Sequence, residues 1–176
     1  MSLGDESGKR QAALRAMAHP VRLQIMSLLT GASLTAAEVA RELHLTHANA
    51  SYHLRNLLAG GLIVPAGEER IRGGVAKRYR YDPDRAHGKP ARSSPENRAL
   101  FVAVANELIR RTTEANWAGQ KTMTDAEVWV APEVWVGIRD RIADLSRELH
   151  DAAQAPRTPG TIRTSTTIAM FEMETP

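Results

Sequence analysis

The sequence predicts an α+β protein that is mainly helical, in which a compact front module precedes a helical region with a small β component. Three observations predict this fold class. Two short amphipathic helices, each beginning at a threonine, follow one another within residues 34–63. A stretch of alternating residues with a glycine pair near its centre comes directly after them. Two longer amphipathic stretches occupy the second half of the chain.

The distribution of charge separates the front of the chain from the rear. The chain has 176 residues, 43% of them hydrophobic, and a net charge of only +3. Residues 1–92 hold 14 Lys and Arg against 8 Asp and Glu, whereas residues 93–176 hold 9 against 12. A basic front half favours a DNA-binding module joined to a region with another task, although chance asymmetry among surface charges gives the same pattern.

Two helical stretches precede the threonine-capped pair. Residues 9–17 place apolar side chains on one side of a short helix, and the chain restarts after His19-Pro20 as a second helix that ends at Gly31. Proline suits the first turn of a helix and disfavours the α conformation in the residue before it. We therefore expect His19 to be a boundary or capping residue, and both helices to supply core beneath the pair that follows.

The threonine-capped pair has local signals for its boundaries. Thr35 precedes Glu38 by three residues, as in a capping box, where hydroxyl and carboxylate each accept a hydrogen bond from a free backbone N–H. Thr46 caps the second helix and a glycine pair ends it, so this helix is expected over residues 47–59. Its core stripe at helical spacing consists of Ala50, Leu54, Leu57 and Leu58.

The outward face of helix 47–59 carries side chains that hydrogen-bond, and none of them is acidic. Small residues and hydrogen-bonding groups with an arginine fit a major groove and can pair with base edges and phosphates. An ordinary solvated face is the alternative, because helix-turn-helix arrangements also occur in proteins that do not bind nucleic acid. The candidate DNA-binding residues here are Thr46, His47, Asn49, Ser51, Tyr52 and Arg55.

Residues 64–81 predict a basic β-hairpin with its tip at Gly73-Gly74. Such a hairpin after a recognition helix is a wing that can follow a phosphate backbone or enter a minor groove. Which face meets DNA stays open, because Tyr79 and Tyr81 can pack inward and take Lys77 with them. The candidate DNA-binding residues on the wing are Arg70, Arg72, Lys77, Arg78 and Arg80.

The ordered combination of AMAHPVRLQIMSLL, LTAAEVARELHLTHANASYHLRNLLAGGLI and the basic hairpin resembles the winged helix-turn-helix of ArsR-type bacterial transcription regulators. The resemblance covers residues 14–81. It implies a sequence-specific regulator of double-stranded DNA, more often a repressor than an activator, that acts as a homodimer. A winged-helix scaffold that binds protein without reading DNA is the alternative function.

A segment rich in proline, glycine and serine, Asp82 to Pro95, predicts a linker. We expect a DNA-binding domain at residues 1–88 and a C-terminal dimerisation and effector domain at residues 89–176. The rear domain begins with a long helix expected over Glu96–Trp117. Its apolar stripe and the N-terminal helix are the expected dimer interface. The stripe consists of Leu100, Val104 and Leu108.

The remaining rear sequence predicts a small βαβ unit, with strands at Glu127–Val130 and Thr161–Met173 around a helix that begins at Pro132. Two strands are too few to be stable alone, so the unit should pack against the long helix or a second subunit.

If an effector exists, we expect a small organic molecule or a protein near the three tryptophans of the rear half. The commoner role of tryptophans is to anchor a core or an interface. They are Trp117, Trp129 and Trp135.

Metal, cofactor and catalytic chemistry find little support. His44, His47, His53 and Glu42 lie close in sequence, but His44 falls in the turn, and His47 and His53 are six residues apart on a helix and point in different directions. Ser51 follows His47 by four residues without an acid partner. Cysteines and phosphate-binding glycine motifs are absent. We expect no enzyme, metal or cofactor and, because apolar runs are short, a cytoplasmic protein with no membrane partner.

Overall fold

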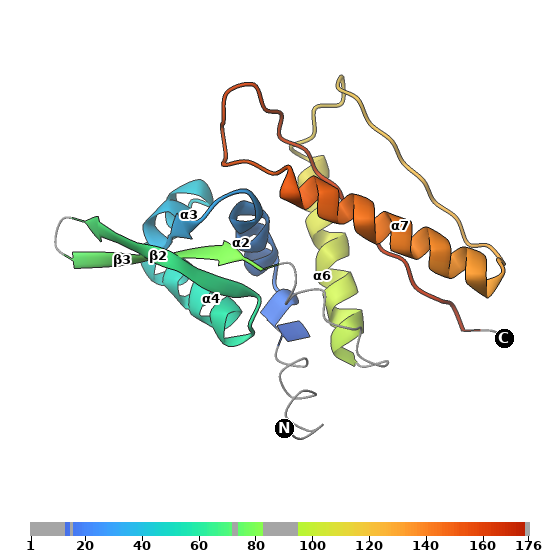
Figure 1. The fold of residues 1–176 in the computed structure, drawn as a ribbon, viewed down its shortest axis with the longest axis horizontal. Helices are drawn as coiled ribbons and strands as arrows, with labels where there is room; N and C mark the ends of the chain where they lie inside the picture. Colours follow the sequence, from blue (N-terminus) through green and yellow to red (C-terminus); the bar gives the residue numbers. More distant parts are fainter. Residues whose placement is uncertain (1–12, 15, 72–73, 83–94, 175–176) are drawn as a thin grey trace.

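The computed structural model describes residues 13–14, 16–71, 74–82 and 95–174. The front half is a winged helix-turn-helix, and the rear half contributes two longer helices (Figure 1). The front elements are α2 (Pro20–Gly31), β1 (Leu34–Thr35), α3 (Ala36–Glu42), α4 (His47–Ala59), β2 (Ile63–Ile71) and β3 (Gly74–Tyr81). The rear helices are α6 (Pro95–Thr112) and α7 (Pro132–Asp151).

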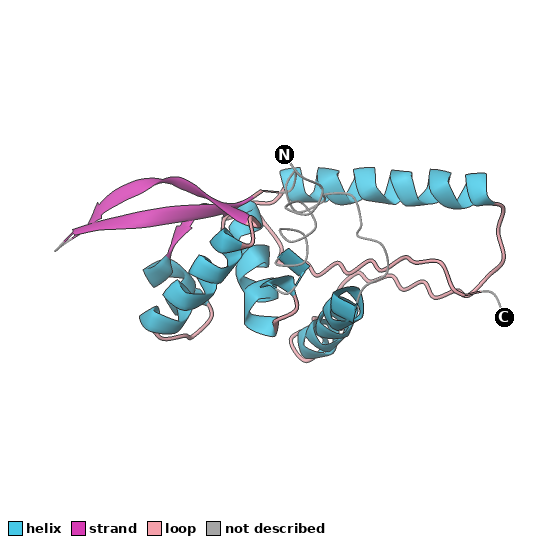
Figure 2. Cartoon of the chain, turned by 90° about the horizontal axis from the view of Figure 1, so that it is seen from below, coloured by secondary structure: helices cyan, strands magenta, loops and turns pink. Residues whose placement is uncertain are grey.

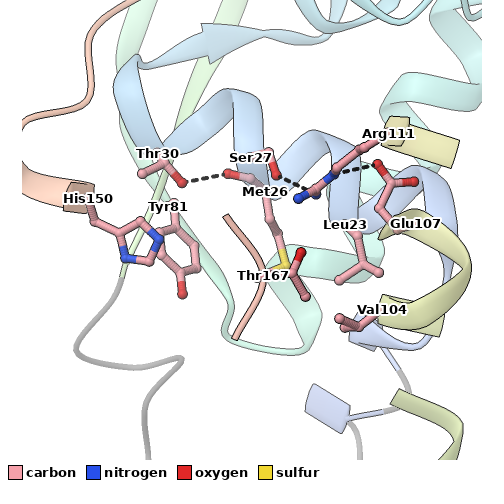
Figure 3. A pocket seen from close by; sticks show the side chains of 10 residues that line it. All are labelled: Leu23, Met26, Ser27, Thr30, Tyr81, Val104, Glu107, Arg111, His150 and Thr167. Carbon is pink, nitrogen blue, oxygen red and sulfur yellow. Dashed lines mark hydrogen bonds and ion pairs between the residues drawn. The ribbon is translucent and has the colours of Figure 1, made fainter. Parts of the chain in front are cut away.

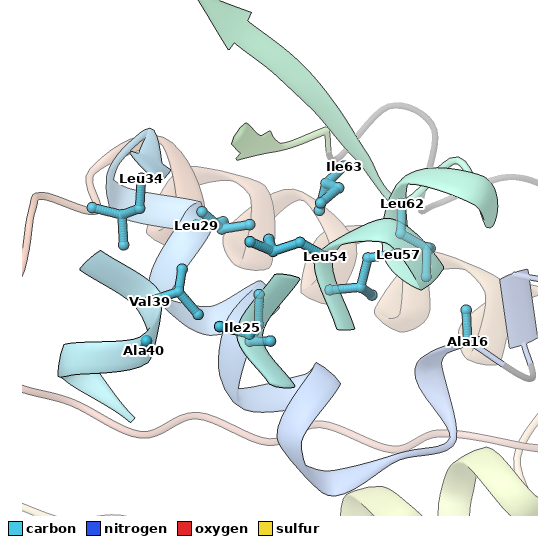
Figure 4. Close-up of a cluster of buried hydrophobic side chains, with 11 residues drawn as sticks. Ala16, Ile25, Leu29, Leu34, Val39, Ala40, Leu54, Leu57, Leu62 and Ile63 are labelled. Atoms are coloured by element: carbon cyan, nitrogen blue, oxygen red, sulfur yellow. The ribbon is translucent and has the colours of Figure 1, made fainter. Parts of the chain in front are cut away.

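One cluster of buried apolar side chains fixes the geometry of the front half (Figure 4). Each such side chain contributes about 1.5–3 kcal/mol when it leaves water. The cluster draws on α2, α3, α4 and the start of β2, so α4 packs against the two other helices and the base of the hairpin. Its most deeply buried members are Ile25, Leu29, Val39, Leu54, Leu57, Leu62 and Ile63.

The predicted caps of the helix-turn-helix are confirmed. The Thr35 amide donates to Glu38 Oε2 at 2.7 Å, and the Glu38 amide donates to Thr35 Oγ1 at 3.3 Å. Thr46 Oγ1 accepts from the Asn49 amide at 3.2 Å at the start of α4, whose bounds are those predicted. The chain leaves α4 through Gly61, whose φ of 70° suits a residue without a side chain.

The wing is an antiparallel hairpin of β2 and β3, joined to β1 in a sheet of order β1-β3-β2. Leu34 lies opposite Tyr79, so the short strand β1 binds the base of the wing to the helices. Tyr79 and Tyr81 pack against the core, whereas Lys77 is exposed farther out. Seen from below, the hairpin reaches away from the helices toward one end of the molecule, and α7 occupies the other end (Figure 2).

The rear half differs from its prediction in two ways. α6 ends at Thr112 instead of Trp117, because the hydroxyls of Thr112 and Thr113 bond to Ile109 O at 2.6 Å and Arg110 O at 2.7 Å in the final turn. The βαβ prediction was wrong, since neither 127–130 nor 161–173 forms a strand. In both views these extended segments run along the direction of α7 (Figures 1 and 2). Neither segment pairs with a strand of the described sheet.

α6 is fastened to the front half by a buried acid that the sequence did not single out. The side chain of Glu107 is 3% exposed, accepts from Gln24 of α2 at 3.1 Å and pairs with Arg110 at 2.7 Å and Arg111 at 3.1 Å. Burial alone would raise the pKa of Glu107, but these hydrogen bonds outweigh the effect of burial and lower that pKa.

Among the described helices, none is long and apolar enough to cross a membrane.

Candidate nucleic-acid interface

α4 presents the predicted face to solvent. Its core stripe is fully buried at Ala50, Leu54 and Leu57, which fixes the rotation of the helix about its axis. Tyr52 is 55% exposed and Ser51 is half-buried. The other predicted contacts on this helix and at its cap are exposed: Thr46, His47, Asn49 and Arg55.

The wing carries exposed cations together with acidic residues that the sequence reasoning did not weigh. Arg70, Lys77 and Arg80 are exposed, and Arg72 lies outside the described residues. Glu68 lies directly opposite Lys77 in the strand register, and Glu69 precedes Arg70. The register shifts between Pro65 and Glu68, where Gly67 has a φ of 110°. This bulge increases the twist of the hairpin near its middle.

Arg78 differs from the other cations of the wing because its guanidinium is engaged inside the protein. It forms an ion pair with Glu69 of β2 and lies 3.3 Å from a carboxylate oxygen of Glu38 in α3. Its Nε donates to Ser33 Oγ at 3.4 Å. Arg78 therefore joins both strands of the wing to the capping box of α3. From the sequence, Arg78 was expected to contact a phosphate, because its partners within the protein become apparent only in the folded structure.

Glu38 has a lowered pKa as a result of the same contacts. Burial acts to raise the pKa of this carboxyl, but hydrogen bonds from Thr35 and the positive charge of Arg78 outweigh it. The carboxylate is thus charged across the neutral pH range and serves α3 and the wing together. This shared use fixes the position of the wing relative to the helix-turn-helix.

A pair of histidines lies beside the exposed face of α4. The rings of His19 and His53 have centroids 4.8 Å apart, and Tyr52 meets His53 edge-on at 5.3 Å. His19 is the N-cap residue of α2, as its position predicted, but its side chain makes no capping hydrogen bond. Burial lowers the pKa of both imidazoles, and the nearby charge of Arg22 lowers it further. The pair links the start of α2 to the middle of α4 in neutral form.

A cavity of about 150 Å³ lies at the junction of the two halves (Figure 3). Leu23 and Met26 of α2 and Val104 of α6 provide apolar lining, and Tyr81 and His150 close it where β3 and α7 end. Burial raises the pKa of Tyr81 to about 12, so its hydroxyl stays protonated. The three tryptophans near which an effector was expected do not line this cavity.

The three histidines considered as metal ligands from the sequence do not come together in the structure. The side chains of His44 and His47 are exposed, whereas that of His53 is half-buried and turned toward His19. In the described part of the chain, no group of three or more His, Cys, Asp and Glu residues could hold a metal ion.

Comparison with known proteins identifies the front module. Residues 17–65 match the family model described as a helix-turn-helix domain, so the chain contains such a domain. No curated protein is significantly similar to the chain. A crystal structure of a possible transcriptional regulatory protein (fragment 1–100) from Mycobacterium bovis is 20% identical. Its match covers 62% of this chain and 96% of that chain with a TM-score of 0.36, so the two structures agree only loosely.

Proposed function

We propose that this protein is a sequence-specific transcription regulator that reads the major groove with α4 and the backbone or minor groove with its wing. The match to a helix-turn-helix domain supports a DNA-binding regulator. The observation that carries the proposal is the exposed, acid-free face of α4, which the core holds in one orientation. Such a face can approach a polyanion without electrostatic repulsion.

The exposed residues of α4 fall into two roles. Asn49 can pair with adenine and Arg55 with guanine, while Tyr52 offers a hydroxyl and an apolar ring at the same face. Thr46 and His47 lie at the start of the helix, where backbone N–H groups and the helix dipole favour a phosphate. Ser51 lies between the two groups and can serve either role.

On the wing, the same proposal distinguishes contact residues from a positioning residue. Arg70, Lys77 and Arg80 are exposed and supply positive charge to the phosphates, together with Arg72. Arg78 positions the wing through Glu38 and Glu69, so its contribution to affinity is indirect.

We further propose that the protein is a homodimeric repressor. Helix-turn-helix proteins read two half-sites about one DNA turn apart, and a single module of this size binds weakly. Residues 89–176 then supply dimerisation and receive a small organic or protein effector. A scaffold that binds only protein is the alternative function.

Selection of bound sequences from a random duplex library tests the function and recovers the operator in the same experiment. The recovered sequence and a scrambled duplex are then compared by fluorescence anisotropy across a salt series. We expect tighter binding to the recovered sequence and, for both duplexes, affinity that falls steeply with salt. Absence of binding to any duplex at low salt would leave the scaffold as the better interpretation.

A further inference from the structure

α7 carries an apolar stripe with the spacing of a coiled coil, and the rest of the chain covers this stripe only in part. No residue of α7 is fully buried. Leu145 is 62% and Leu149 43% exposed, whereas the three stripe residues nearer the start of the helix are half-buried. The stripe residues recur at alternating intervals of three and four, the pattern by which helices pair side by side. They are Trp135, Ile138, Ile142, Leu145 and Leu149.

The chain exposes more surface than a globular monomer of its mass. Its accessible surface is 13310 Å², whereas a globular monomer of 19.3 kDa exposes about 8,500 Å². Residues outside the described part contribute to this total, and a specific interface buries roughly 1,200–2,000 Å². The described rear segments add large exposed apolar side chains, including Met123, Trp129 and Ile162.

The charges on α7 indicate what this partner is. Arg139 pairs with Asp140 at 2.8 Å and Arg147 with Asp144 at 2.8 Å, so these four charges cancel within the helix. Arg141 and Glu148 flank the stripe without an ion-pair partner among the described residues. Arg141 lies at the middle of α7 and Glu148 seven residues farther toward its C-terminal end. Two copies that run antiparallel across a two-fold axis can therefore place each cation beside the anion of the other copy.

The charges also select a register. In an antiparallel pair, Ile142 can lie in one layer with Leu145 of a second copy, and Ile138 with Leu149. Arg141 of each copy then lies beside Glu148 of the other, twice by symmetry. A shift to the neighbouring register sets Arg141 against Arg141, and a parallel pair sets Arg141 against Ser146. Only the first arrangement pairs both charges.

We propose that α7 pairs antiparallel with α7 of a second copy of this chain, with an Arg141–Glu148 ion pair on each side of the seam. This inference rests on the homodimer in the proposed function and names its interface. It replaces the stripe on α6, because that helix is already held to α2 through Glu107.

Charge reversal tests the seam without disturbing a core, because both residues are exposed. We expect Arg141→Glu or Glu148→Arg alone to weaken self-association of the full chain about 10-fold or more, since each variant loses two pairs and gains two repulsions. The double variant should return within about threefold of wild type. Arg147→Glu, on the outer face of α7, is the matched control and should leave association unchanged. Sedimentation equilibrium over a concentration series measures all four.

Leu145→Glu provides a second test, because it places a charge in the seam. The side chain of Leu145 is exposed and does not belong to the described core, so the fold should tolerate the change. We expect a monomer at concentrations where wild type is a dimer. Dimerisation of Leu145→Glu like wild type, or a monomeric wild type, would overturn the seam. Single variants that weaken association without rescue by the double variant would overturn the register. Binding of a selected duplex by these same proteins reports separately on the proposed DNA reading by α4.

Discussion

Gly31, the last residue of α2, lies directly against the backbone of Gln154 in the turn that follows α7. A β-carbon at position 31 would stand 2.2 Å from Gln154 O and 2.7 Å from its carbonyl carbon, distances that real structures do not allow. The same turn region reaches α3, where Arg157 pairs with Glu42 at 2.6 Å. The segment after α7 is therefore docked on the helix-turn-helix at a point that only glycine permits.

Gly31→Ala should release this docked segment, because backbone atoms cannot yield as a flexible side chain can. We expect faster hydrogen exchange and easier proteolysis at residues 152–157, with a loss of about 1–3 kcal/mol in unfolding free energy. Gly137→Ala in α7 is the matched control. A β-carbon there meets nothing within 4 Å, so it should stabilise its helix by about 0.5–1 kcal/mol. Equal exchange at 152–157 in Gly31→Ala and wild type would contradict the close approach.

Substitutions on the face of α4 should reduce sequence preference. Asn49→Ala or Arg55→Ala removes a side chain that can pair with a base edge, a contact worth roughly 1–3 kcal/mol of discrimination. We expect affinity for the selected duplex to fall toward that for scrambled DNA, with little change in nonspecific binding. Anisotropy with both duplexes at one salt concentration measures the ratio. A ratio that stays at the wild-type value in both variants would show that α4 does not read bases.

Two matched arginine substitutions on the wing should behave differently. Arg70→Gln removes an exposed cation and should lower the salt dependence of binding by about one unit of slope. Arg78→Gln instead leaves Glu38 and Glu69 without their shared cation, and we expect a loss of about 1–2 kcal/mol in unfolding free energy. Urea denaturation and a salt series on each variant separate the two effects. Similar stability of Arg78→Gln and wild type would reject the positioning role.

The histidine pair should make stability depend on pH below about 6.5. His19 and His53 have a lower pKa in the folded chain than the ordinary 6.5. Burial is the main cause for both, followed by the charge of Arg22 for His19, and by the charges of His19 and then Arg22 for His53. The unfolded chain therefore binds more protons in this range, so stability is complete above pH 6.5 and decreases as pH falls below it. The lowered pKa values of Glu38 and Glu107 act only below about 4.5.

Urea denaturation between pH 4.5 and 7.5 measures this dependence. We expect His53→Gln to flatten the curve in that range, because it removes one of the two imidazoles that the folded state keeps neutral. His47→Gln, on the same helix but outside the pair, is the control. A curve for His53→Gln as steep as that for wild type would assign the dependence to other groups.

Elements with local signals could be predicted from the sequence alone. Thr35 with Glu38, and Thr46, mark helix starts through hydrogen bonds that span three residues, and a proline at position 20 opens α2. The stripe around Leu54 fixes which side of α4 is buried, so the exposed face of the candidate site followed from periodicity. The hairpin followed from alternation around a glycine pair.

Features that depend on residues far apart in the chain emerged only in the folded structure. A strand needs a neighbouring strand, and residues 127–130 and 161–173 found none, although their composition suits strands. Arg78 lies beside Glu38, 40 positions earlier in the chain. Gly31 lies against the backbone of Gln154, which comes from the far part of the chain. Local patterns specify caps and faces, but the partner that completes a distant contact appears only after the chain has folded.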